Sequence, residues 1–153
     1  MHPWLRCAVV CGLLMCNSAT KNNELRFHLS IPKAIAAQEE RRLAGDAAAP
    51  APVLILHGLE FGANEGFKIE LLGEAKPGGS PVSLAVTGVV GHPQRTPQLP
   101  LRKIDLPVPL NDAAAQLLAN HTEVTIIVHF DHVDPDRPPV KIDSIYFSTP
   151  AKE

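Results

Sequence analysis

Apolar and polar residues alternate along much of this 153-residue chain with a period of two. That period is typical of a β-strand with one face buried and the other in water. Residues that favour turns, mainly Gly, Pro, Asn and Asp, separate the alternating runs. The pattern predicts about seven strands, over residues 25–31, 53–61, 67–72, 82–90, 101–110, 123–130 and 140–148.

One short helix is expected after Asn111, because Asn is a favoured N-cap and the residues up to 120 are rich in Ala and Leu. Residues 34–43 are also compatible with a short helix, and residues 45–52 read as a linker of small residues. No long helices alternate with the strands. We therefore expect a mainly β fold, namely a jelly-roll-like antiparallel β-sandwich of about seven strands with one short helix.

The N-terminus has the three parts of a secretory signal: a positively charged start, an apolar run over residues 7–16, and small residues after it. The run is too short to span a bilayer, so we expect no transmembrane span. We predict a signal or targeting segment at residues 1–19 and a secreted or exported protein, in a periplasm, an organelle lumen or the extracellular space. Residues 20–52 then hold the first strand, the short helical run and the linker, and residues 53–149 the sandwich core.

Composition limits the classes of partner that the chain is expected to bind. The net charge is −2, and no basic run is longer than Arg41-Arg42, which argues against nucleic acid, because phosphate contacts need clustered Lys and Arg. All three cysteines lie within the predicted signal. The remainder of the chain therefore has no thiol to offer as a metal ligand or for a disulfide.

The best metal candidates are His129, His132 and Asp134, since imidazole and carboxylate groups bind metal ions. We favour the alternative of a solvated hairpin tip, because the two histidines fall on opposite sides of an ideal strand. His57 is interpreted as a strand-edge residue. No nucleophile–base set or phosphate-binding loop stands out, so we expect no catalytic residue and no cofactor. Asn120 begins an Asn-His-Thr glycosylation sequon.

Two neighbouring motifs carry a family resemblance. Gly58-Leu59-Glu60-Phe61 ends an apolar strand, and Phe67-Lys68-Ile69-Glu70-Leu71 follows it. In order and character they resemble the Gly-Ile-Glu-Phe and Val-Lys-Phe-Asp-Val motifs of the C-terminal domain of plant-type polyphenol oxidases, the tyrosinase and catechol oxidase relatives. The later segments follow in the family's order up to about residue 148. The resemblance implies a β-sandwich that covers the mouth of a copper site located in another domain, and a structural role for the motif residues.

From these observations we expect a non-catalytic accessory domain that covers or binds a protein surface, with a tyrosinase-type copper oxidase as the candidate partner. One alternative is an independent secreted module that binds a small ligand, a sugar or a metal through the loops at residues 91–100 and 131–139. A second alternative is a detached gene fragment with no role of its own.

Overall fold

The computed structural model describes residues 23–62, 66–90, 101–131 and 140–148. The predicted signal segment, the loop at residues 91–100, and His132 and Asp134 lie outside these ranges. In chain order the elements are β1 (Glu24–Ser30), α1 (Lys33–Leu43), β2 (Val53–Gly62), β3 (Phe67–Glu74), β4 (Val82–Val89), β5 (Leu101–Pro109), α2 (Ala113–Asn120), β6 (Glu123–Asp131) and β7 (Ser144–Ser148).

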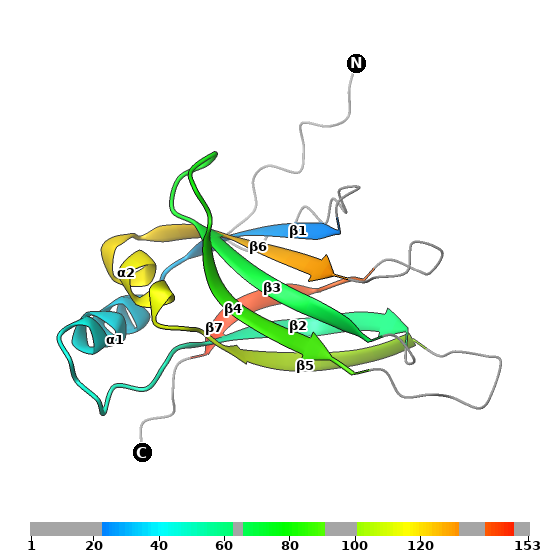
Figure 1. The fold of residues 1–153 in the computed structure, drawn as a ribbon, viewed down its shortest axis with the longest axis horizontal. Coiled ribbons are helices and arrows are strands. Elements are labelled where there is room, and N and C mark those ends of the chain that lie inside the picture. The colour runs from blue at the N-terminus through cyan, green and yellow to red at the C-terminus, as the bar shows by residue number, and fades with distance from the viewer. Residues whose placement is uncertain (1–22, 63–65, 91–100, 132–139, 149–153) are drawn as a thin grey trace.

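The strands form two antiparallel sheets that pack face to face (Figure 1). The larger sheet has the order β1-β6-β3-β4, and the smaller has the order β5-β2-β7. The predicted mainly β sandwich is therefore confirmed. The described residues contain two helices rather than one, because the Ala- and Glu-rich run after Pro32 forms the 11-residue α1. Neither of these helices is long and apolar enough to cross a membrane.

The connectivity differs from what the sequence suggested. Only β3 and β4 are consecutive strands that pair with each other; every other connection passes from one sheet to the other. The two family-like motifs are neighbours in the sequence, but the strands that hold them, β2 and β3, lie in opposite sheets. Similarly, the loop after β6 does not join a hairpin, because β7 belongs to the smaller sheet. Alternation in a sequence tells which face of a strand is buried, but not which strand lies beside it.

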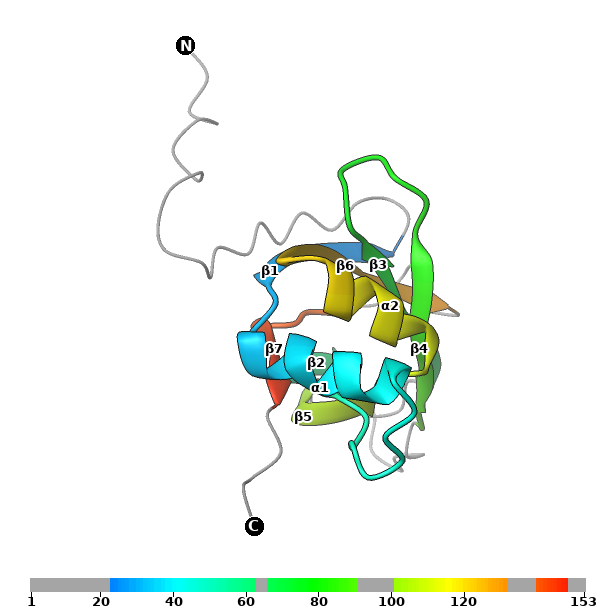
Figure 2. The same ribbon diagram turned by 90° about the vertical axis from the view of Figure 1, so that its left-hand side faces the viewer.

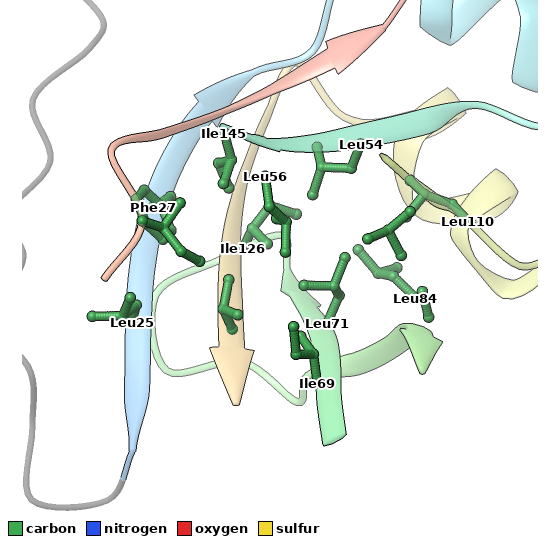
Figure 3. Close-up of a cluster of buried hydrophobic side chains, with 14 of the residues drawn as sticks. Leu25, Phe27, Leu54, Leu56, Ile69, Leu71, Leu84, Leu110, Ile126 and Ile145 are labelled. Atoms are coloured by element: carbon green, nitrogen blue, oxygen red, sulfur yellow. The ribbon is translucent and has the colours of Figure 1, made fainter. Parts of the chain in front are cut away.

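The core lies between the inward faces of the two sheets, where apolar side chains interdigitate (Figure 3). Two aromatic residues of the motifs meet there across the core. The rings of Phe61 and Phe67 pack edge to face with centroids 5.5 Å apart, and Phe130 continues the contact at 5.9 Å from Phe67. The labelled members of the cluster are Leu25, Phe27, Leu54, Leu56, Ile69, Leu71, Leu84, Leu110, Ile126 and Ile145.

The two helices lie side by side at one end of the sandwich (Figure 2). The side chain of Ile35 in α1 is fully buried and belongs to the core. Glu39 is also fully buried, and both of its carboxylate oxygens accept hydrogen bonds of 3.0 Å from Arg42. Arg42 in turn contacts Asp112, immediately before α2. These charged contacts tie α1 to the residue before α2.

Candidate functional site

The most distinctive local geometry is a β-bulge in β2, the central strand of the smaller sheet. The register between β2 and β5 shifts between Leu56 and Leu59, so that His57 and Gly58 together oppose Asp105. Gly58 has a φ of +67°, a conformation that other residues rarely adopt. A Cβ atom at this position would lie 2.2 Å from Oδ2 of Asp143. Bulges of this kind redirect side chains and are frequent next to functional sites.

The bulge brings an imidazole and a carboxylate together on the outer face of the sheet. The Asp105 carboxylate accepts a 2.9 Å hydrogen bond from the Gly58 N–H and lies 2.8 Å from Nδ1 of His57. The Gly58 hydrogen bond, with the nearby His57 and Lys103, holds the pKa of Asp105 below its ordinary value. The ionised carboxylate therefore fixes the orientation of the imidazole through Nδ1, and Nε2 is the ring nitrogen that remains for a ligand.

An ion pair between Lys103 and Asp143 lies beside the His57–Asp105 contact. Nζ of Lys103 is 2.8 Å from Oδ2 of Asp143, and the hydrogen bond and charge of that carboxylate raise the pKa of the lysine. The backbone N–H of Asp143 donates a 2.9 Å hydrogen bond to the carbonyl of His57, which places the carboxylate against Gly58. Glu60 pairs in register with Lys103 on one side and bridges to Lys141 on the other. The face is therefore rich in charge but locally balanced.

An apolar row adjoins these charges. Ile55 of β2 stands in register between Pro107 of β5 and Tyr146 of β7. Tyr146 is 46% exposed, a large value for an aromatic side chain in a sheet, and its ring centroid lies 6.5 Å from that of His57. We call the surface formed by Ile55, His57, Lys103, Asp105, Pro107 and Tyr146 the β2 face. It joins apolar and charged groups on an open surface suited to binding a macromolecule.

A groove lies elsewhere in the molecule, at the helical end. It has a volume of about 620 Å³ and lies between Leu43 of α1, helix α2 and Val82 at the start of β4. Asn120 of the sequon lines this groove, is exposed, and donates a 2.8 Å hydrogen bond to the Gln116 carbonyl. The groove contains no cluster of reactive groups among its described lining residues.

The metal candidates are only partly described by the structure. His129 lies on the outer face of the larger sheet, where Nδ1 is 3.7 Å from Glu24 and Nε2 is 3.5 Å from Asp131. Its Nδ1 is buried without a hydrogen bond. Within the described ranges no three His, Cys, Asp or Glu side chains converge as a metal site.

The apolar and polar residues of the family-like motifs have different surroundings. Phe61, Phe67, Ile69 and Leu71 are buried in the core. Lys68 is exposed, Glu70 accepts a 3.2 Å hydrogen bond from Ser83, and Glu60 is bonded to Lys141 through the backbone. Gly58 differs from the rest, because it shapes the bulge at the centre of the β2 face.

Sequence reasoning misplaced His57 and missed its partners. His57 was interpreted as a strand-edge residue, but β2 pairs on both sides, so the interpretation is wrong. Asp105, 47 residues from Gly58, and Asp143 reach the bulge only through tertiary pairing. One signal was available: a His-Gly step inside an apolar strand favours a bulge.

No protein-family model matches the chain, and no curated protein matches it in sequence. The resemblance to the oxidase domain therefore rests on the motif residues and their order along the chain.

Proposed function

We propose that the chain is a non-catalytic β-sandwich accessory domain that uses the β2 face to cover a protein surface, and that the partner is a tyrosinase-type copper oxidase domain. The observation that carries the proposal is the composition of the β2 face. An exposed tyrosine, a proline and an isoleucine lie in a row beside the His57–Asp105 contact and the Lys103–Asp143 ion pair. Apolar anchors with polar neighbours are the usual anatomy of an interface between domains.

The chemistry of the face supports binding rather than catalysis. His57 and Asp105 have half-exposed side chains on an open sheet. A general base or an oxyanion-stabilising group gains most of its effect in a site that excludes water. The open β2 face excludes water only when a partner covers it. Tyr146 and the oriented imidazole are then contact residues, of the types that carry most of the binding energy at interfaces.

The family resemblance supports the choice of partner. In the resembled domain the sandwich covers a copper site supplied by another domain, and the order and spacing of the segments in this chain resemble that domain over about residues 25–148. A separate chain of this kind would act in trans on an oxidase, by binding over its substrate entrance.

Co-expression of the full chain with a tyrosinase-type oxidase domain tests the proposal. We expect a complex on size-exclusion chromatography and slower oxidation of a phenol substrate than by the oxidase alone. Replacing an anchor, in Tyr146→Ala or His57→Ala, should weaken the complex by about tenfold or more per residue, the effect of losing a typical interface hot spot.

His28→Ala is the matched control. His28 is an exposed histidine 3.4 Å from a carboxylate, Glu123, but it lies on the outer face of the opposite sheet. It should leave the complex intact. Absence of both a complex and any change in oxidation rate would contradict the proposed partner. A complex weakened equally by His28→Ala and His57→Ala would contradict the assignment of the β2 face.

A further inference from the structure

Strand β4 forms one edge of the larger sheet, and within the described residues it pairs only with β3. Residues 82–90 contain neither a charged residue nor a proline. An uncharged edge strand is a template for pairing with another strand, and proteins normally protect such edges. The backbone on the outer side of β4 is therefore able to pair with a further strand.

The other three edges carry recognisable protection. Strand β1 alternates its apolar residues with Glu24, Arg26 and His28. Strand β5 contains Pro107 and Pro109, which cannot donate to a further strand. Strand β7 has only five residues. Charges, prolines, bulges and short length are the usual devices against edge pairing. Strand β4 has only a register irregularity near its beginning, where Leu71 pairs with Ala85 but Leu72 pairs with Ser83.

Hydrogen-bond alternation identifies which groups of β4 point outward. The Phe130 N–H donates to Asn23, so the backbone of Phe130 faces β1 and that of its neighbour His129 faces β3. His129 pairs with Glu70, so the backbone groups of Glu70 point towards β6. The backbone groups of the preceding residue, Ile69, therefore point towards β4. Thr87 pairs with Ile69, which turns the N–H and C=O groups of the intervening Val86 and Gly88 away from the sheet.

Asn111 contacts the beginning of the β4 edge. Its N–H donates a 2.8 Å hydrogen bond to the Leu84 carbonyl, at the irregularity where Leu71 pairs with Ala85 but Leu72 pairs with Ser83. The Asn111 side chain donates a 3.0 Å hydrogen bond to the carbonyl of Ser83. Asn111 thus covers the beginning of the β4 edge. No described residue covers Val86 or Gly88 in the same way.

The side chains along this open stretch are also exposed. Val86 is 56% exposed and Val90 is 78% exposed, the two largest values among the described large hydrophobic residues. Val86 and Gly88 face the outer side of the sheet, in register with Glu70 and Lys68. Val90 lies just beyond the end of β4 and would continue the same alternation if a further strand extended the pairing. Gly88 leaves space between the two valines.

We infer that β4 pairs antiparallel with β4 of a second copy of this chain, about a two-fold axis beside Gly88. In this register Val86 opposes Val90 of the other copy, so each exposed valine is covered by its counterpart. The open backbone groups form about six hydrogen bonds between the copies. The axis leaves Leu84 outside the pairing, where its carbonyl already has Asn111 as a partner.

A second copy suits this edge better than a charged partner strand. The segment is neutral, so two copies meet without like-charge repulsion, and no charge on it would select an oppositely charged strand. A closed two-fold contact also uses the edge completely and leaves no new edge of the same kind. The result is a continuous sheet across two sandwiches, separate from the β2 face.

Sedimentation velocity of the full chain over a range from about 1 to 500 μM tests the inference, since edge pairing buries less area than a standard interface and is correspondingly weak. We expect a shift from the 16.5 kDa monomer towards twice that mass. Val86→Lys should raise the dissociation constant about tenfold or more. Tyr146→Lys, an equally polar change on the β2 face, should leave it unchanged.

Amide hydrogen exchange of the unaltered protein provides a measurement that does not depend on a variant. The N–H groups of Val86 and Gly88 should be unprotected at the lowest concentration and become protected as the dimer forms. A monomer at all concentrations would overturn the inference. Protection that does not change with concentration would overturn it as well, because the edge would then be covered from within the same chain.

Discussion

Replacing Gly58 by alanine should be the most informative single change in the smaller sheet. Two separate penalties meet at this residue. Its φ of +67° lies in the left-handed region, where a Cβ atom contacts the backbone unfavourably. The new Cβ would also lie 2.2, 2.6 and 2.9 Å from Oδ2, Cγ and Cβ of Asp143, all closer than real Cβ contacts allow.

An approximate size can be given for each penalty. The left-handed conformation costs an alanine about 1–2 kcal/mol. The overlap adds about 1–3 kcal/mol, the usual cost of forcing an extra methyl group into an occupied space. Asp143 has little freedom to move away, because its N–H is bonded to the carbonyl of His57 and its carboxylate to Lys103. We therefore expect Gly58→Ala to lower the free energy of unfolding by about 2–5 kcal/mol.

Urea denaturation followed by far-ultraviolet circular dichroism measures this loss of stability. Another glycine of the chain allows the conformational cost to be measured separately from the cost of the overlap. Gly78 has a φ of +75° with no atom within 4 Å of an added Cβ, so Gly78→Ala should show only the conformational cost. In an Asp143→Ala background the two closest atoms are gone, and Gly58→Ala should then approach the cost of Gly78→Ala. The difference between backgrounds is a coupling free energy from a double-mutant cycle.

Equal losses of stability in Gly58→Ala and Gly78→Ala would contradict this prediction, since the contact with Asp143 would then have no energetic effect. A coupling of zero in the cycle would do the same. Either result would mean that the backbone at the bulge shifts at little cost, and that Asp143 does not restrain the backbone of His57 and Gly58.

Three further predictions concern other parts of the fold, and urea denaturation measures each. Gly73→Ala should cost about 1–3 kcal/mol, because its Cβ would lie 2.6 Å from Leu117, and Leu117→Ala in the same chain should recover part of that loss. Arg42→Ala should lower the free energy of unfolding by about 3 kcal/mol, because it leaves the buried Glu39 carboxylate unpaired. The same substitution should cost much less in a Glu39→Gln background, and an equal loss in both backgrounds would contradict this prediction. Asp105 has a lowered pKa, so its stabilising contribution is complete above the ordinary pKa of an aspartate and is lost as the pH falls through the folded-state value. Between about pH 5 and 2, Asp105→Asn should therefore lose stability less steeply than the unaltered chain, and parallel curves would contradict the assignment.

The positions of the strands could be read from the sequence, because a strand with one buried face imposes a period of two on its own residues. In β3 the alternation places Phe67, Ile69 and Leu71 on one face of the strand, and all three are buried in the structure. The helix after Asn111 was likewise predicted from local residue preferences, and the Asn111 side chain accepts a hydrogen bond from the Ala114 N–H. Each of these predictions depends on residues that are close neighbours along the chain.

The pairing of strands and the composition of the β2 face depended on the tertiary structure. Phe61 and Phe67 are near neighbours in sequence, yet they meet across the core from opposite sheets. His57 lies beside Asp105 because β5 pairs with β2 in one particular register, and Asp143 approaches because β7 pairs on the other side. Pairing of this kind is selected by the packing of whole faces against each other, and a local pattern contains no information about which distant face will be the partner.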